Sequence, residues 1–134
     1  MAEINSEGES VARILVADDD TASLDVMALA LTAEGHEVSC ATNGQEAYEL
    51  TLHDKPDLVF LDIMMPVYSG YETCELLRND PEVPSELPIV FLTSLEPDTR
   101  MLERVGASDH LPKRHMVVEL RELLARHLGA DANP

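Results

Sequence analysis

The stretch Asp57–Pro66, with the sequence DLVFLDIMMP, decides the fold that we expect for this chain. Four apolar residues, Leu58 to Leu61, run directly into the carboxylate of Asp62. A continuous apolar run of this length between two prolines is typical of a strand that is buried on both faces of a sheet. Asp62 then lies at the carboxyl end of the strand, the edge where ligands bind in open parallel α/β sheets. Asp62 is therefore the first candidate functional residue.

Similar patterns recur along the chain. We predict five strands, at residues 13–17, 37–42, 58–62, 88–93 and 108–112. We predict five helices after them, at residues 21–34, 45–53, 71–79, 97–105 and 116–128. Strands that alternate with helices imply an α/β fold, in which a doubly wound parallel sheet is covered by helices on both faces and the crossovers are right-handed.

Local signals fix some details of these elements. Pro97 is expected to open its helix in the first turn. Apolar spacing places four side chains of the last helix on one inward face, namely Val117, Leu120, Leu124 and Leu128. The two cysteines, Cys40 and Cys74, fall in a predicted strand and a predicted helix, so we expect two buried, reduced thiols.

Length and charge limit the possible functions. The chain has 134 residues, enough for one domain at residues 11–128, with polar tails at 1–10 and 129–134 that we expect to be disordered. The net charge of −17 argues against direct binding to nucleic acid. The sequence has neither a secretion signal nor an apolar run long enough to cross a membrane, so we expect a cytoplasmic protein without membrane contact.

Four of the five predicted strands end in a polar group. Asp18 and Asp19, Asp62, Thr93 and Lys113 all occupy such positions. Carboxylates that meet at one sheet edge repel each other and need a cation, and Mg²⁺ suits hard oxygen ligands that leave positions open for phosphate. A carboxylate can also attack a phosphoryl group and form an aspartyl phosphate. The pattern therefore predicts a magnesium-dependent phosphoryl site.

Four motifs in this order, ILVADDD, DLVFLDIMMP, PIVFLTS and GASDHLPK, resemble those of bacterial two-component response-regulator receiver domains. The resemblance covers about residues 12–128 and suggests a stand-alone receiver similar to chemotaxis regulators. It implies a flavodoxin-like fold, a five-stranded parallel sheet in the order 2-1-3-4-5. It also implies a role for each strand-end residue.

By this resemblance, Asp62 is the phosphoacceptor, Thr93 binds a phosphoryl oxygen, and Lys113 pairs first with Asp62 and then with the phosphoryl group. The expected metal ligands are Asp18, Asp19, Asp62 and the backbone carbonyl of Met64. The protein would take its phosphoryl group from a histidine kinase or a His-containing phosphotransferase and then act on a downstream protein target. It would not be an enzyme beyond slow, magnesium-dependent self-dephosphorylation.

Further roles follow from positions near the acceptor. His110 stands where receiver domains usually carry an aromatic switch residue that moves with Thr93; the alternative is a partly exposed edge-strand histidine without that role. Met64 and Leu95 each lie two residues beyond an active residue and flank the water path to the phosphoryl group in similar domains. Neither side chain can orient a water, so we expect slow loss of phosphate.

Two features depart from the family pattern. Lys113 is followed by Arg114 where receiver domains carry proline, which leaves a cis or a trans bond open. The segment from Thr93 to Gly106 is short, which predicts a short fourth helix. Both departures fall on the expected output face, formed by the fourth helix, fifth strand and fifth helix. The arginines expected on that face are Arg100, Arg104, Arg114 and Arg121. We expect an unusual partner surface there, in a monomer or weak homodimer.

Two other functions fit parts of the pattern. A binding module of the same fold, with an output independent of phosphate, is favoured by Arg114 and the short helix. A phosphatase of the haloacid dehalogenase type also uses a strand-end aspartate, but its signature needs Thr or Val where this chain has Ala22. The intact set of acids, hydroxyl and lysine favours the phosphorylated receiver.

Overall fold

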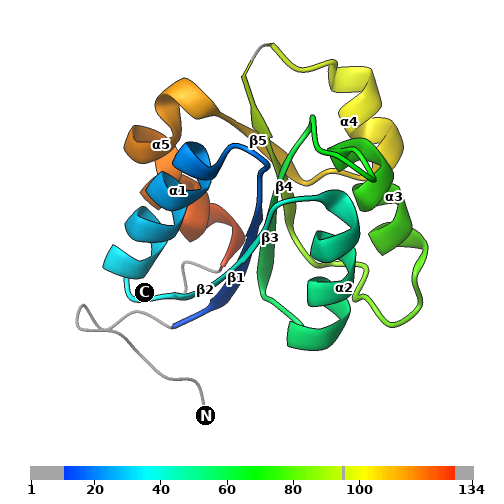
Figure 1. The fold of residues 1–134 in the computed structure, drawn as a ribbon, viewed down its shortest axis with the longest axis horizontal. Coiled ribbons are helices and arrows are strands. Elements are labelled where there is room, and N and C mark those ends of the chain that lie inside the picture. The colour runs from blue at the N-terminus through cyan, green and yellow to red at the C-terminus, as the bar shows by residue number, and fades with distance from the viewer. Residues whose placement is uncertain (1–10, 95, 129–134) are drawn as a thin grey trace.

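A computed structural model describes residues 11–94 and 96–128 (Figure 1). The two predicted tails, and Leu95, lie outside the described residues. The strands are β1 (Arg13–Ala17), β2 (Glu37–Ala41), β3 (Leu58–Asp62), β4 (Ile89–Thr93) and β5 (Asp109–Pro112). The helices are α1 (Thr21–Ala33), α2 (Gly44–Asp54), α3 (Gly70–Asn79), α4 (Thr99–Val105) and α5 (Met116–His127), with a 3₁₀ turn at Lys113–His115.

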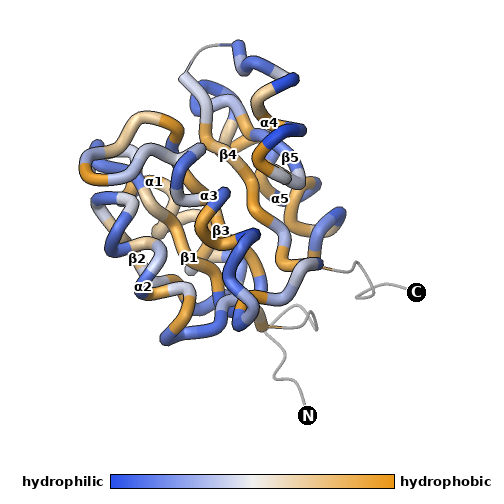
Figure 2. The backbone as a smooth tube through the Cα atoms, turned by 90° about the vertical axis from the view of Figure 1, so that its right-hand side faces the viewer, coloured by the Kyte–Doolittle hydropathy of each residue, from blue (hydrophilic) through white to orange (hydrophobic). Residues whose placement is uncertain are grey.

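The five strands form one parallel sheet in the order β2-β1-β3-β4-β5. Helices α1 and α5 cover one face, and α2, α3 and α4 cover the other (Figure 1). Every residue of β3 and β4 is buried, as expected for apolar strands between two helical layers. Figure 2, which colours the backbone by residue hydropathy, accordingly shows hydrophobic residues along the central strands and hydrophilic residues mostly on the outside. The predicted doubly wound, flavodoxin-like fold is confirmed.

Side-chain caps set the starts of the helices. Asp20, Asn43 and Asp98 each accept a hydrogen bond from a backbone N–H in the first turn of α1, α2 and α4. Ser69 and Glu72 form a reciprocal capping box at α3. The prediction that Pro97 opens α4 is wrong by two residues, because the carboxylate of Asp98 binds the N–H groups of Arg100 and Met101. The helix is consequently only seven residues long.

The inward face of α5 differs from the prediction. Val117 is 64% exposed, and the buried face consists of Met116, Leu120, Leu123 and Leu124. Two helical stripes share Leu120 and Leu124, and spacing alone does not choose between them. The burial of Met116 directly after the 3₁₀ turn selects the other stripe.

The two cysteines have different environments. Cys74 is buried in α3, and its Sγ lies 3.3 Å from the carbonyl oxygen of Val105. Cys40 is exposed, which corrects the expectation of a buried thiol. Its strand, β2, is at the edge of the sheet and has β1 as its one neighbour among the described strands, so its side chains are less covered than those of a central strand.

Arg78 fixes the position of the segment between α4 and β5. Its guanidinium donates to the carbonyl oxygens of Gly106 (2.9 Å) and Ser85 (3.2 Å) and to the hydroxyl of Ser108 (3.2 Å). The same hydroxyl accepts a hydrogen bond from the backbone N–H of Ile89 at the start of β4. One side chain of α3 therefore ties the loop before β4 to the α4–β5 connection, which no local sequence signal indicated.

Within residues 11–94 and 96–128, the helices are all too short or too polar to span a bilayer.

Candidate functional site

The acidic residues predicted from the strand ends come together. Strands β1 and β3 are neighbours, and Ala17 is opposite Leu61, so the next residues, Asp18 and Asp62, lie side by side. One carboxylate oxygen from each of Asp18, Asp19 and Asp62 lies within 4.8 Å of the other two. Asp18 and Asp62 are buried, whereas Asp19 is exposed.

Lys113 completes this cluster from the last strand. Pro112 is opposite Thr93 at the end of the β4–β5 pair, which brings the next residue to the same edge. The Nζ of Lys113 lies 2.8 Å from Oδ2 of Asp18 and 3.5 Å from Oδ1 of Asp62. The Lys113–Arg114 bond is trans. Arg114 in place of proline therefore does not keep the ammonium away from the two carboxylates.

Burial and charge shift the protonation of the cluster. Burial and the neighbouring carboxylate of Asp18 raise the pKa of Asp62 to about 6, although the charge of Lys113 opposes the shift. For Lys113, burial lowers the pKa, but the hydrogen bond to Asp18 and the charges of Asp62 and Asp18 raise it further, so the net shift is upward. The lysine is therefore a permanent cation, while Asp62 takes up a proton in mildly acidic solution.

Thr93 presents an unsatisfied hydroxyl at the end of β4. The residue is 2% exposed, and its Oγ1 has no hydrogen-bond partner among the described residues. A buried polar group without a partner is costly, so such a hydroxyl is ready to bond with an oxygen that enters the site.

The β3–α3 loop borders the acidic cluster. Met64 is 76% exposed, and Val67 has a backbone φ of 69°, a left-handed conformation that is unusual for a β-branched residue. The loop closes through a hydrogen bond of 2.8 Å from the N–H of Gly70 to the carbonyl of Ile63. A Cβ at Gly70 would lie 2.3 Å from the carbonyl oxygen of Asp62, so only glycine fits behind the candidate acceptor.

The remaining predicted residues are more scattered. His110 is partly exposed on β5, opposite Phe91 of β4. Leu95 lies outside the described residues. Arg121 does not join the other arginines of the expected output face, since it pairs at 3.1 Å with Glu34 at the end of α1. The prediction that Arg121 belongs to the arginine cluster of the output face is therefore wrong.

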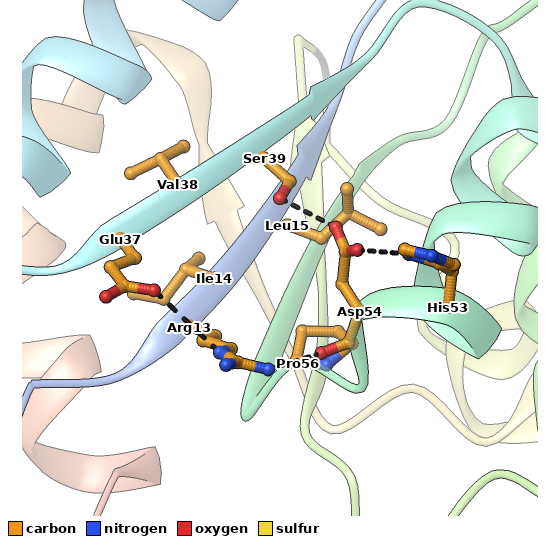
Figure 3. Close-up of a pocket in the computed structure, with 9 residues that line it drawn as sticks. All are labelled: Arg13, Ile14, Leu15, Glu37, Val38, Ser39, His53, Asp54 and Pro56. Carbon is orange, nitrogen blue, oxygen red and sulfur yellow. Dashed lines mark hydrogen bonds and ion pairs between the residues drawn. The ribbon is translucent and has the colours of Figure 1, made fainter.

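A pocket of about 430 Å³ lies at the opposite end of the strands (Figure 3). Ser39 donates a hydrogen bond of 2.9 Å to Asp54, and His53 contacts the other oxygen of the same carboxylate at 2.8 Å. The acid is in the middle, so the imidazole is not placed to take a proton from Ser39, as a hydrolytic triad requires. The pocket is also lined by Arg13 and Glu37 and does not include the acidic cluster.

Residues 14–125 match the family model of the response regulator receiver domain. The chain belongs to this family. Receiver domains of this family act as phosphoacceptors in two-component signalling.

Individual relatives agree. The chain is 42% identical over 119 residues to the response regulator MprA of Mycolicibacterium vanbaalenii, an alignment that covers 85% of this chain and 48% of MprA. It thus spans about half the length of that relative. The receiver domain of the sensor histidine kinase PA1611 from Pseudomonas aeruginosa, solved with magnesium in its active-site cleft, is 25% identical with a TM-score of 0.80, covering 90% of this chain and 99% of that one. The BeF₃-activated receiver domain of Klebsiella pneumoniae RstA is 35% identical, with a TM-score of 0.77 and coverage of 87% and 98%.

The residues of this receiver domain suit a magnesium ion. The donors are carboxylate oxygens, the hard ligands that Mg²⁺ prefers, and the exposed Asp19 leaves one side accessible to water. The cluster has three carboxylates and one ammonium, which contacts Asp18 and Asp62, so it has an excess of negative charge that a dication would balance. The donor type and the charge of the acidic cluster, as well as the separation of its oxygens, therefore suit a bound magnesium ion.

Proposed function

We propose that Asp62 of this receiver domain accepts a phosphoryl group from a phosphohistidine. A carboxylate oxygen of Asp62 forms a bond to phosphorus as the bond from phosphorus to the imidazole nitrogen breaks, and the imidazole leaves with the electron pair. The observation that carries the proposal is the position of Asp62 beside the ammonium of Lys113, with the unpartnered hydroxyl of Thr93 at the end of the neighbouring strand β4. Both groups can bond to oxygens of the transferred phosphoryl group.

The metal ligands would be Asp18, Asp19, Asp62 and the backbone carbonyl of Met64. A bound magnesium ion supplies positive charge to the phosphoryl oxygens during transfer. Lys113 keeps the carboxylates of Asp18 and Asp62 together and transfers its contact from Asp62 to the phosphoryl group as the charge of Asp62 is used in the new bond.

The upstream partner would be a histidine kinase or a His-containing phosphotransferase. Thr93 would move toward the phosphoryl group, and His110, on the neighbouring strand, would follow as the switch residue. The change would alter binding of a downstream protein at the face formed by α4, β5 and α5, in a monomer or weak homodimer. The seven-residue α4 makes this face smaller than a full-length helix would.

The proposal is tested by incubation with acetyl phosphate and Mg²⁺, followed by intact-mass analysis. We expect a gain of one phosphoryl group in the wild type, none in Asp62→Asn, and none when EDTA is present. A wild type that remains unmodified under these conditions, and also with a phosphorylated histidine kinase, would contradict it.

A second candidate is a binding module whose output is independent of phosphate, which the short α4 favours. Amide spectra with Mg²⁺ and beryllofluoride separate the two functions. The phosphorylated receiver predicts shifts that extend from Asp62 to α4 and β5, and the independent module predicts none beyond the acidic cluster.

A further inference from the structure

Two charged side chains meet between the β4–α4 loop and the 3₁₀ turn, the segments that follow Thr93 and contain Lys113, and we call this place the rim of the site. Glu96 lies three residues beyond Thr93 in that loop, and Arg114 directly follows Lys113 in the turn. A terminal nitrogen of Arg114 lies 4.0 Å from a carboxylate oxygen of Glu96. The pair therefore joins the two segments that deliver Thr93 and Lys113 to the site.

This ion pair is easily exchanged. The side chains of Arg114 and Glu96 are 58% and 91% exposed, and a separation of 4.0 Å is at the long end for an ion pair. Exposed pairs of this kind contribute little to stability, because water screens them and both long side chains lose freedom. Another anion can thus replace Glu96 at a small cost.

Among the described side chains, the other cation at the site is Lys113, which is not free to receive an anionic donor. The side chain of Lys113 is only 17% exposed, and its ammonium already contacts Asp18 and Asp62. A bound dication would balance the carboxylates of Asp18, Asp19 and Asp62 but would leave no surplus positive charge to attract a dianionic phosphoryl group. A guanidinium stays charged at all relevant pH values, and its N–H groups match two phosphate oxygens at once.

We propose that Arg114 is a binding residue for the incoming phosphodonor, and that Glu96 holds its guanidinium at the rim until the donor replaces it. This inference rests on the proposed function of Asp62, because it names the group that receives the donor of that site. The donor class is a small molecule with a dianionic phosphoryl group, such as an acyl phosphate. Arg114 contacts phosphoryl oxygens, while Asp62 forms the new bond to phosphorus and the acyl oxygen leaves with its electron pair as a carboxylate.

The test measures the second-order rate constant for phosphorylation by acetyl phosphate with saturating Mg²⁺, by intact mass at low and high ionic strength. Arg114→Gln is expected to lower this constant about two- to fivefold at low salt, the range for one exposed charged contact. Arg114→Lys keeps the charge but loses the paired N–H geometry, so its rate constant should lie between those of the wild type and Arg114→Gln. Glu96→Gln frees the guanidinium and raises the rate by a similar factor.

Arg104→Gln is the matched control. It removes the same charge from an exposed position in the last turn of α4, away from the rim. Only a local role predicts that Arg114→Gln is slower than Arg104→Gln and that its rate responds less to added salt. Equal rates and equal salt responses in the two variants, with a reactive wild type, would overturn the inference alone. An unreactive wild type would overturn the proposed function and this inference together.

Discussion

The Nζ of Lys113 lies closer to Asp18, at 2.8 Å, than to Asp62, at 3.5 Å. The lysine therefore stabilises the folded protein as well as serving the proposed acceptor, since Asp18 is completely buried. Lys113→Met is expected to lower the free energy of unfolding at pH 7.5 by about 3 kcal/mol, because it leaves buried carboxylates without their cation. Urea titration measures the loss.

Added magnesium distinguishes two causes of the lower stability of Lys113→Met, namely uncompensated carboxylate charge and a general packing defect. A dication at the carboxylates replaces part of the missing charge, so added Mg²⁺ should stabilise Lys113→Met more than the wild type. Arg104→Met, which removes an exposed cation from α4, is the control and should stay close to wild type. A loss in Lys113→Met that Mg²⁺ leaves unchanged would contradict the charge argument.

The raised pKa of Asp62 predicts how stability depends on pH without metal. The carboxyl ionises near 3.8 in the unfolded chain and near 6 in the folded protein. Between these values the folded protein holds the proton more tightly, so the free energy of unfolding falls as the pH rises, and the loss is complete above about pH 6. Asp62→Asn should therefore be more stable than wild type at pH 7.5 by about 2 kcal/mol.

The same difference should vanish near pH 4, where the wild-type carboxyl is protonated in the folded state. Urea titrations at pH 7.5 and pH 4 measure the difference in free energy of unfolding between Asp62→Asn and wild type. Asp25→Asn, which removes an exposed carboxylate from α1, is the control. A gain for Asp62→Asn that is equal at the two pH values would show that ionisation is not its cause.

Val67 stores backbone strain beside the site. Its φ of 69° lies at the centre of a tight turn in which Tyr68 N–H donates to Pro66 carbonyl at 2.8 Å. The side chain is mostly exposed, so little packing is lost on its removal. Val67→Gly should stabilise the protein by about 1 kcal/mol. This value is the strain energy that is released, minus the cost of the greater freedom of glycine in the unfolded chain. Val67→Ala keeps a Cβ and should gain less, and an equal gain would argue against strain.

Arg78 should control the local stability of the α4–β5 connection. Arg78→Lys keeps the charge but cannot donate to Gly106, Ser85 and Ser108 together. We expect a loss of about 1–2 kcal/mol and faster amide exchange at Ser108 and Ile89, while exchange in α1 is unchanged. Faster exchange throughout the molecule would instead indicate global destabilisation.

The lifetime of the proposed aspartyl phosphate tests the roles of Met64 and Leu95. A thioether and an isobutyl group cannot orient an attacking water, so we expect slow dephosphorylation of the wild type. Met64→Asn introduces an amide at an exposed position and should speed the loss of phosphate roughly threefold or more. Intact mass over time after removal of the donor measures it, and rapid loss from the wild type would contradict the prediction.

The sheet and the meeting of Asp18, Asp62, Thr93 and Lys113 could be predicted from the sequence, because parallel strands end at a common edge. The contacts that choose between equivalent patterns could not. Val117 and Met116 satisfy the same helical spacing, and only the preceding turn decides which one is buried. The exposure of Cys40 depends on β2 being at the edge. Arg78 acts on carbonyl oxygens 7 and 28 residues away, and spacing carries no signal for such pairs.

The close approach of Gly70 to the carbonyl oxygen of Asp62 affects how mutational data on this protein should be interpreted. In a saturation scan scored by signalling alone, every substitution at Gly70 would fail, and the position would be indistinguishable from the acceptor. A second scan scored by cellular abundance would separate them. Asp62→Asn should remain abundant and silent, whereas variants at Gly70 should be depleted from the soluble pool.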